Sequence, residues 1–522
     1  MLNWRHMLLL AFLGVVVSGG IANFQDSPGY MDADYYFAGG LQLADGKGFN
    51  EPYLWNYLDN PVSLPHPSHS YWMPLASILA AFGMSLAGQN SWFAGRIFFL
   101  LIAAFIPIIT STLAYSFSKR GDLALISGLL AIFSGFYSVF IPVTDTFGIY
   151  MVLGGIFFLV AHRHGVWSSI SMGLIAGLMH LARADGIYWL FVSFLIILFK
   201  PVVNFSYPKY INKIFMGGLS LLGYLLIMSA WLIRNNIVFG SFLAPGGEGM
   251  LWLSNYNQVF SYPPGSITFV SWLETGLVEA LKVRLWALNI NMQNALASQG
   301  SIFLFPLILI GIWKLREDLR IIIAVISWLG YMIVMSIIFP FIGARGGFFH
   351  SGASLQPMWW ALAPIGLVTL VGWVGEKRAW KIEQATRIFL WATIGLSILF
   401  TCFVALGKLF SPGDGSNIWS TEINLYRKVD IMIDSPSLIN PIVIVANPPG
   451  FYLATGKSAI AVPDGDEKVT LLVAKKFNAN FLVLEKEGFP YGLISLYNNP
   501  DLYPDFNYLG ELDGARVFKI NP

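Results

Sequence analysis

Long runs of apolar residues alternate with short polar stretches along most of the chain. A helix needs about 20 apolar residues to cross the hydrocarbon core of a bilayer. Runs near this length, a few of them shorter, predict about eleven spanning helices, near residues 7–24, 93–117, 122–142, 145–162, 167–182, 186–200, 213–233, 296–313, 321–340, 355–374 and 388–410. The pattern therefore predicts a mostly α-helical, multi-pass membrane protein.

The distribution of Lys and Arg predicts the orientation of these helices. Basic residues gather in cytoplasmic loops, and here they form six clusters, the first at Arg5 and the last at 377–387. These clusters occupy every second loop if the apolar stretch 73–87, which is about 15 residues long and contains Pro74, does not cross. We interpret that stretch as an interfacial or re-entrant helix. The N-terminus is then expected in the cytoplasm and the C-terminus outside the plasma membrane.

The pattern changes near residue 411, where an ordinary mixture of polar and apolar residues begins. Short apolar runs at 442–446 and 481–484 are typical of buried strands, and residues 466–477 have the pattern of a helix between them. We expect two parts. Residues 1–410 form a transmembrane module with long outer loops at 25–92 and 234–295, and residues 411–522 form a small extracytoplasmic α/β domain.

Composition agrees with this interpretation and excludes some functions. The chain of 522 residues is 56% hydrophobic and only 11% charged, against roughly 25% charged residues in soluble proteins. A formal net charge of +2 leaves no broad basic face for nucleic acid. The single cysteine, Cys402, excludes an intrachain disulfide and a cysteine-based metal site.

Charged and titratable residues collect at the predicted outer ends of the spans. Charge near a membrane boundary is costly and often marks function. A carboxylate can take a proton from an attacking hydroxyl, and arginine binds phosphate through two parallel hydrogen bonds. Both kinds occur here, in a set that comprises Asp32, Asp34, His66, His69, Asp145, Arg183, Asp185, Arg234, Arg345 and His350.

Structural interpretations stay open for most of this set. Asp32 and Asp34 could be solvated or could start a helix, and Asp145 could cap one. Arg234 could be an interfacial anchor, and Arg183 could form an ion pair with Asp185. Arg345 lies among glycines, which suggests close approach by another group. His66 and His69 could bind a metal together with Asp32 or Asp34, although two histidines without a third fixed ligand are weak evidence.

Several short motifs share one order along residues 1–375. They are the acidic stretch Asp32-Ala33-Asp34-Tyr35-Tyr36 with Gly46–Phe49, the proline helix start at Met73-Pro74, Gly95-Arg96, the acid Asp145, Arg183-Ala184-Asp185-Gly186, and the segment 231–235 followed by Phe239-Gly240-Ser241. Together they resemble the membrane glycosyltransferases of the GT-C fold, in particular the protein O-mannosyltransferase and aminoarabinose-transferase-like group. That group uses polyprenyl-phosphate sugars as donors.

The resemblance implies an inverting glycosyltransferase that acts on the outer face of the membrane. Where the family often has Asp-Glu, this chain has Asp32 followed by Ala33, so Asp32 is expected to be the general base, with Asp34 as its rival. Asp145 would orient hydroxyl groups. We expect donor phosphate at Arg183, Arg234 and Arg345, and sugar or acceptor at Tyr35, Asp185 and His350. The tail is not a β-trefoil, so the acceptor, whether protein, lipid or glycan, stays undefined.

The resemblance requires no cofactor, since arginines can bind the phosphate, and a divalent metal ion is compatible with it. No glycine-rich nucleotide loop is present. Two other classes stay open: a secondary transporter, and a non-catalytic assembly or receptor protein whose tail binds a partner. Transporters place their charges at the bilayer midplane, often with inverted repeats, whereas these charges lie at one predicted boundary.

Overall fold

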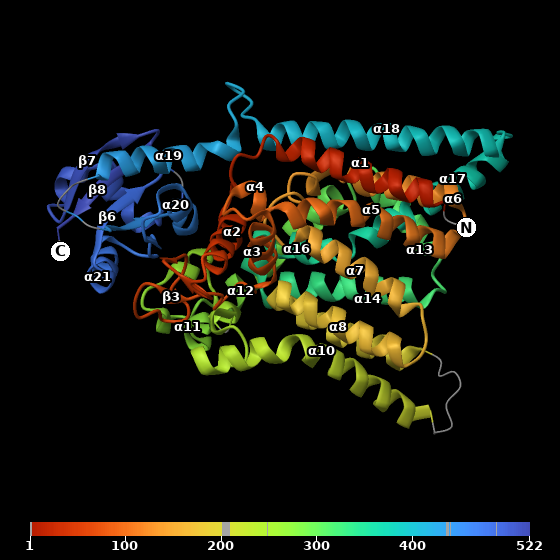
Figure 1. Ribbon diagram of the computed structural model, residues 1–522, viewed down its shortest axis with the longest axis horizontal. Coiled ribbons are helices and arrows are strands. Elements are labelled where there is room, and N and C mark those ends of the chain that lie inside the picture. Colours follow the sequence, from red (N-terminus) through yellow and green to blue (C-terminus); the bar gives the residue numbers. More distant parts are fainter. Residues whose placement is uncertain are drawn as a thin grey trace.

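The structure is a computed structural model that describes residues 3–200, 209–247, 249–434, 438, 440–486 and 488–521. Most of these residues lie in a bundle of long helices, with a smaller α/β unit at one end (Figure 1). The N-terminus and the α/β unit lie at opposite ends of the bundle.

The bundle is formed by the helices that the apolar runs predict. They are α1 (Trp4–Ala22), α5 (Ile97–Ser118), α6 (Gly121–Ile132), α7 (Phe147–Ala161), α8 (Val166–Ala182), α9 (Tyr188–Phe199), α10 (Lys209–Phe239), α13 (Phe305–Lys314), α14 (Leu319–Ile333), α17 (Gln356–Arg378) and α18 (Ile382–Leu409). Within the described residues, six helices are long and apolar enough to cross a membrane. The expected mostly helical membrane architecture is confirmed, whereas the number of eleven spans stays a prediction.

Two predicted spans differ from the observed helices at their ends. The run 122–142 contains α6, which ends at Ile132, and the chain then turns at Gly135, where φ is +60°. The run 296–313 begins in a π-helical segment, and α13 starts only at Phe305. Apolar composition continues past a helix end wherever the following loop is itself buried, so it overestimates helix length at these sites.

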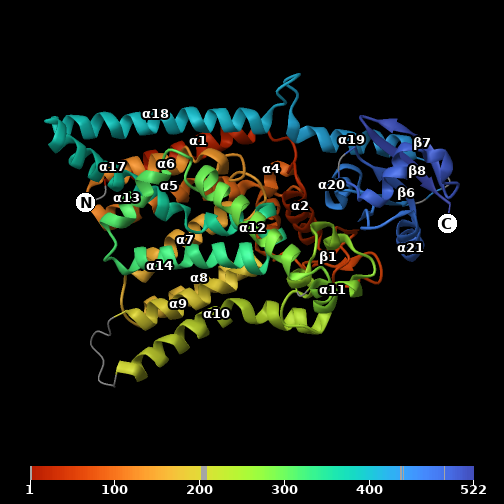
Figure 2. The ribbon, with the colours of Figure 1, turned by 180° about the vertical axis from the view of Figure 1, so that it is seen from behind.

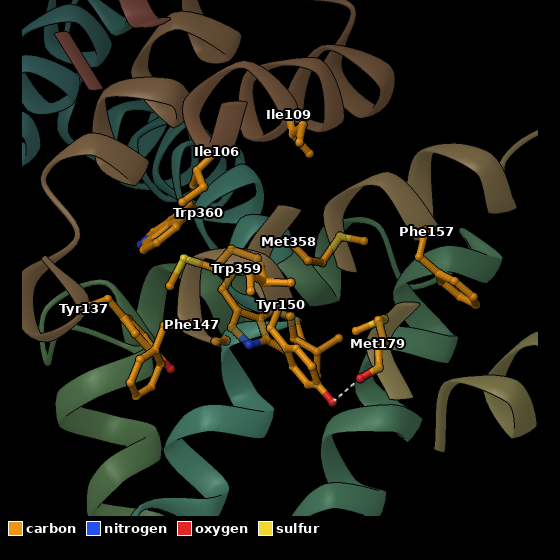
Figure 3. Packing of buried hydrophobic residues seen from close by; sticks show 14 of the residues in the cluster. Ile106, Ile109, Tyr137, Phe147, Tyr150, Phe157, Met179, Met358, Trp359 and Trp360 are labelled. Carbon is orange, nitrogen blue, oxygen red and sulfur yellow. Dashed lines mark hydrogen bonds between the residues drawn. The ribbon is translucent and has the colours of Figure 1, made fainter. Parts of the chain in front are cut away.

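The core of the bundle lies where α5, α7, α8 and α17 meet. Large side chains from these helices interlock, among them Tyr150 of α7 and Trp360 of α17, both fully buried (Figure 3). The Tyr150 hydroxyl donates a hydrogen bond to the carbonyl of Met179 near the end of α8, at 3.2 Å. Because the phenol is buried with its hydrogen bond satisfied, it fixes the end of α8. Arg183 directly follows that end.

The loop 25–92 forms a compact cap on the bundle. It contains α2 (Met31–Ala44) and α3 (Leu75–Ala87), and α4 (Trp92–Gly95) begins at its end. The short strands β1 (Asn50–Glu51) and β3 (His66–Pro67) pair antiparallel within it. Gly39 and Gly40 let α2 and α3 approach closely, since a Cβ on either would lie under 3 Å from Ser77 or Ala80. These helices lie at the end of the bundle that carries the α/β unit (Figure 2).

The second long loop, predicted at 234–295, contains two helices, α11 (Phe269–Glu274) and α12 (Leu277–Asn294). Three π-helical segments follow in this part of the chain: η7 (Ala295–Gln299), η8 (Val334–Ile338) and η9 (Gly343–Gly347). Between and after them lie α15 (Pro340–Ile342) and α16 (Phe348–Ala353). Each π turn carries one extra residue, so these helices bend instead of running straight.

The tail begins with α19 (Ile418–Ile433) and supplies five strands of a six-stranded sheet, whose sixth strand is β2 (Tyr53–Leu54). Its elements are β4 (Ile442–Val445), α20 (Pro448–Thr455), β5 (Ala459–Ala461), α21 (Glu467–Phe477), β6 (Ala479–Leu484), α22 (Ile494–Asn498), β7 (Phe506–Leu512) and β8 (Ala515–Ile520). The strand order is β2-β5-β4-β6-β8-β7, with β5, β4 and β6 parallel and β8 and β7 antiparallel to their neighbours.

The edge strand β2 (Tyr53–Leu54) comes from the loop 25–92 and pairs in parallel with β5. Leu54 and Tyr57 are buried in the tail's apolar core, and the Tyr57 hydroxyl donates to the carbonyl of Ala461. The loop and the tail therefore share one sheet. The boundary that the sequence predicts near residue 411 does not separate them in space.

Candidate active site

Three side chains from distant segments meet at the end of the bundle nearest the tail. Asp32 begins α2, Asp145 lies just before α7, and His350 belongs to α16. His350 Nε2 lies 3.2 Å from Asp145 Oδ2 and 3.8 Å from Asp32 Oδ2. Asp145 is almost fully buried, whereas the Asp32 side chain is 31% exposed. Asp32 is therefore the carboxylate of this group that an incoming molecule can reach.

The backbone kink between η9 and α16 aims His350. Arg345 has non-helical φ/ψ values and Gly346 has φ of +113°, a conformation that favours glycine. His350 Nδ1 lies 3.0 Å from the carbonyl oxygen of Gly346. Since a carbonyl only accepts, Nδ1 carries the hydrogen of this bond, and Nε2 is left to face the two carboxylates.

The segment 143–147 holds Asp145 through a set of donors. Tyr30 Oη donates to Asp145 Oδ2 at 2.6 Å, and the amide and hydroxyl of Thr146 donate to Oδ1. The hydroxyl of Thr144 donates to the carbonyl of Ala33 at 2.8 Å and ties this segment to α2. The acid is thus fixed in position by its hydrogen bonds.

The two acids of this group have different pKa shifts. Burial and the charge of Asp145 raise the pKa of Asp32 to about 6, against the opposing effect of His350 and Arg183. Burial acts to raise the pKa of Asp145, but His350 and the donors Tyr30 and Thr146 together lower it below its usual value. Asp145 therefore stays ionised, while Asp32 exchanges a proton near neutral pH.

Arg183 and Asp185 form an ion pair beside this group. Arg183 Nε donates to Asp185 Oδ1 at 2.8 Å, and the Ser351 hydroxyl donates to Asp185 Oδ2 at 2.8 Å. Against burial, which lowers it, Asp185 raises the pKa of Arg183. Arg183 and Asp185 thus form the ion pair that the sequence left open. The guanidinium uses one of its five N–H donors here, so the pair does not exhaust its capacity to bind a phosphate.

Arg345 lies in η9, five residues before His350. Its guanidinium lies over the ring of Tyr256 at 4.1 Å. Burial raises the pKa of Tyr256, with the charge of Asp32 adding to this effect and that of Arg345 opposing it. Tyr256 therefore lies within electrostatic reach of both the acid and the arginine. Arg345 itself is exposed, as a residue that receives a ligand must be.

Asp34 does not face the group of Asp32, Asp145 and His350. It is buried and accepts a hydrogen bond from Asn447 Nδ2 of the tail at 2.8 Å. Burial raises the pKa of Asp34 to about 7, against the opposing bond from Asn447. Asp32 and Asp34 lie two residues apart, which on a helix puts them roughly on opposite faces.

A second polar cluster lies on another side of α2. Arg234 donates to the carbonyl of Ser68 at 2.9 Å and lies against the rings of Trp231 and Phe239. Tyr35 is buried and its hydroxyl accepts from the backbone amide of His69 at 2.7 Å. These contacts hold the loop 25–92 together. Neither side chain has a described contact with Asp32, Asp145 or His350.

The predicted histidine pair is divided between two sets of partners. His66 Nε2 lies 2.6 Å from Asp59 Oδ2. His69 is fully buried between the hydroxyls of Ser68 and Ser77, and burial lowers its pKa to about 3. Within the described part of the chain, the side chains that lie close enough together to share a metal ion are Asp32, Asp145 and His350, a group that does not contain His66 or His69.

Comparison with solved structures identifies the fold. The crystal structure of the Archaeoglobus fulgidus oligosaccharyltransferase in complex with Zn and sulfate matches with a TM-score of 0.57 at 12% identity, over 98% of this chain and 72% of that one. ArnT from Cupriavidus metallidurans bound to undecaprenyl phosphate matches with a TM-score of 0.54 at 13% identity, over 99% of both chains. This chain has the GT-C fold. No family model matches the chain, and no curated protein does.

The resemblance to GT-C glycosyltransferases that the motifs indicate is therefore confirmed in three dimensions. ArnT in the apo state matches with a TM-score of 0.55 at 11% identity, over 99% of this chain and 98% of that one. At these identities the likeness establishes the shared fold, and the chemistry of this chain has to be argued from its own residues.

The sequence analysis did not identify several residues that lie near Asp32, Asp145 and the arginines. Tyr36, not Tyr35, lies within electrostatic reach of Asp32, Asp145 and Arg183. The spacing is the signal that could have found it, since residues i and i+4 share a helix face. Tyr30 precedes α2, Tyr256 begins a short 3-10 helix and Ser351 lies in the short helix α16, and elements this short carry little periodic signal.

The group Asp32, Asp145 and His350 fits a divalent metal ion. One ligand atom from each lies within 4.8 Å of the others. Two carboxylates and one imidazole are a donor set typical of zinc and manganese. The bond from His350 Nδ1 to Gly346 leaves Nε2 facing acceptor oxygens, an arrangement that a proton or a cation has to neutralise.

Proposed function

We propose that this chain is an inverting membrane glycosyltransferase that moves a sugar from a polyprenyl-phosphate carrier to an acceptor hydroxyl. One observation carries the proposal: a partly exposed carboxylate, Asp32, lies beside a buried acid–imidazole pair and within electrostatic reach of Arg183, and Tyr256 lies within reach of both Asp32 and Arg345, in a GT-C fold. Two of the matched structures contain a polyprenyl phosphate, undecaprenyl phosphate in ArnT and dolichol phosphate in the archaeal oligosaccharyltransferase.

In the proposed reaction, Asp32 accepts the proton of the acceptor hydroxyl. The acceptor oxygen attacks the anomeric carbon, the bond from that carbon to the phosphate oxygen breaks, and polyprenyl phosphate leaves on the opposite side. The new glycosidic bond therefore has inverted configuration. A carboxyl group with a pKa of about 6 is ionised in most molecules at neutral pH and still basic enough to act as a general base.

Arg183 and Arg345 stabilise the leaving phosphate. Negative charge grows on the phosphate oxygens as the bond breaks, and preorganised donors lower the energy of that state. Arg183 is fixed by Asp185 and Arg345 lies against Tyr256, so neither side chain needs to be ordered during the reaction. Arg234, the third arginine that the sequence favours for phosphate, is engaged by the loop 25–92, and its contact with donor stays a prediction.

A divalent ion held by Asp32, Asp145 and His350 would supply further positive charge for the phosphate. Asp145 and His350 orient this site through Tyr30 and Gly346.

We assign the candidate site to the extracytoplasmic side of the plasma membrane. Its elements α2 and α16 lie at the end of the bundle opposite the N-terminus (Figure 1), and the basic loops of the sequence favour a cytoplasmic N-terminus. The charged groups thus gather at one end of the helices, as a lipid-phosphate enzyme requires, whereas a secondary transporter places them at the midplane.

The test is transfer in membranes supplied with polyprenyl-phosphate sugars, measured as release of free polyprenyl phosphate. Asp32→Asn should reduce the rate by about 10²- to 10⁴-fold, the contribution typical of a general base, while the protein still folds. Asp45→Asn is the matched control, since Asp45 lies exposed at the other end of α2 with Lys47 as its partner. Near wild-type turnover in Asp32→Asn would remove this residue from the mechanism.

A further inference from the structure

Asn447 occupies a position in the tail that usually binds ligands. It follows β4, the strand from which the chain passes first to β5 on one side and then to β6 on the other. In open α/β sheets the carboxyl ends of the strands at such a reversal form the ligand crevice. Here that crevice is filled by the first turn of α2.

The carboxamide of Asn447 is completely used in this contact. Its Nδ2 donates to Asp34 Oδ2 at 2.8 Å and to Glu422 Oε2 at 2.9 Å. Its Oδ1 accepts from the amide of Gly450 at 3.0 Å. The side chain is 4% exposed. One buried amide therefore joins the loop 25–92, which carries Asp32 and is called the catalytic loop below, to α19 and α20 of the tail.

The partners of Asn447 are held in turn. The Tyr426 hydroxyl lies 3.0 Å from Glu422 Oε1 and 2.8 Å from Glu485 Oε1. A hydroxyl has one hydrogen to donate, so both contacts are favourable only when one of the two glutamates is itself protonated and donates to the phenol. Gly450 completes the fit, since a Cβ there would lie 2.6 Å from the nitrogen of Asn447.

We propose that Asn447 is a positioning residue for the catalytic loop. By binding Asp34 it fixes the first turn of α2, and through that turn it orients Asp32 toward Asp145 and His350. Asp34 is then the anchor of the loop, and Asp32 is the base. The statement about Asp32 rests on the proposed function, whereas the statement about the first turn of α2 does not.

Three full-length variants test this assignment. Asn447→Asp keeps the cap on α20, because Asp accepts from the Gly450 amide as Asn does, but it opposes two carboxylates across the contact. The double variant Asp34→Asn with Asn447→Asp restores a donor and an acceptor with their roles exchanged. Tyr452→Phe is the matched control. It removes the bond that Gln42 Nε2 donates to Tyr452 Oη at 2.7 Å, a contact between α2 and the tail at the far end of the helix.

Two measurements are made on each variant: hydrogen exchange of the first-turn amides of α2, and the transfer rate. In Asn447→Asp we expect exchange to rise about tenfold or more and kcat to fall by a similar factor with KM unchanged, since losing a buried bond to a charged group has an effect of that size. The double variant should return both to within about threefold of the wild type. Tyr452→Phe should leave the first turn unchanged.

The outcomes separate this proposal from the proposed function. Unchanged exchange in Asn447→Asp, or an equal rise in Tyr452→Phe, overturns the positioning role whatever the activity. Restored exchange without restored transfer keeps the positioning role of Asn447 but overturns the assignment of Asp32 as the base, because the Asp34 carboxylate is then needed for the chemistry itself. Absence of transfer by the wild type with every donor overturns the proposed function, and the exchange data still decide whether Asn447 holds the loop.

Discussion

Two acids separated by one residue face different parts of the molecule. Asp32 points toward Asp145 and His350, and Asp34 points into the tail. Successive residues of a helix are turned by about 100°, so a spacing of two puts the side chains on nearly opposite faces. The two acids therefore have different partners, and in the proposed function one serves the chemistry and the other the attachment of the loop.

Arg345 is expected to bind the donor. Replacing it by alanine removes a guanidinium that is free to pair with phosphate, and the affinity for polyprenyl-phosphate sugar should fall by roughly 10- to 100-fold, as expected for charged hydrogen bonds. Binding of a labelled donor to purified protein measures this effect.

Arg284→Ala is the control for that measurement. Arg284 also lies over an aromatic ring, Trp272 at 5.2 Å, but it belongs to α12 and has no described contact with the acidic group. Equal donor affinity in Arg345→Ala and the wild type would assign the phosphate to other residues.

At the scale of elements, π turns place the site. The backbone between α14 and α17 passes through η8, α15, η9 and α16 instead of one straight helix. The kink at η9 orients His350 toward Asp145 and Arg345 toward Tyr256, which lies within electrostatic reach of Asp32. A regular helix would put residues five positions apart on different parts of its surface.

Gly343 makes this kink sterically feasible. A Cβ at Gly343 would lie 1.8 Å from the carbonyl oxygen of Met335, so Gly343→Ala should force η9 away from η8 at a cost of about 1–3 kcal/mol. We expect transfer to be lost while the bundle remains folded, as measured by turnover and thermal unfolding. Gly372→Ala, on α17 with open space around it, should behave as the wild type, and a matching loss there would contradict this explanation.

The strand β2 fastens the loop 25–92 to the tail by packing. Leu54 is 1% exposed in the tail's core, so Leu54→Ala should leave a cavity and destabilise this attachment by roughly 2–5 kcal/mol. Limited proteolysis of the loop and the tail reports the opening. Val62→Ala in the same loop changes a side chain that is 73% exposed, and equal protease sensitivity of the two variants would count against the shared sheet.

At the scale of the whole molecule, the tail forms one wall of the catalytic end. Its buried carboxyl groups make the attachment sensitive to pH. Burial, together with the charges of Asp34 and Glu485, raises the pKa of Glu422 to about 8 from an ordinary value of 4.5, against the opposing hydrogen bonds from Asn447 and Tyr426. Glu422 therefore binds a proton on folding, and its contribution to stability is complete below pH 4.5.

That contribution is lost as the pH rises through about 8. We expect the unfolding temperature of the tail to be lower at pH 9 than at pH 6, and Glu422→Gln to flatten this dependence. Differential scanning fluorimetry of the full chain measures it. Asp501→Asn, which alters an exposed acid of the tail, should keep the wild-type pH profile. A profile that Glu422→Gln leaves unaltered would assign the pH dependence to another group.

The sequence by itself determined the bundle and the residue types of the site. Apolar runs have to be buried in lipid or in a core, so their positions predict the helices whatever the tertiary arrangement. The order of the motifs around Asp32, Asp145 and Arg183 indicated the GT-C fold, and the solved structures confirmed it.

Only the tertiary structure decided which of those residues meet. Contacts such as that of His350 with Asp145, 205 positions apart, depend on the π turns of η9, and hydropathy carries no signal for a π turn. It also placed Arg234 and Tyr35 in a separate cluster. The contact of Asn447 with Asp34 spans 413 positions. It depends on β2, the strand of the loop 25–92 that joins the tail's sheet. A strand of two residues is too short for its sequence to predict that pairing.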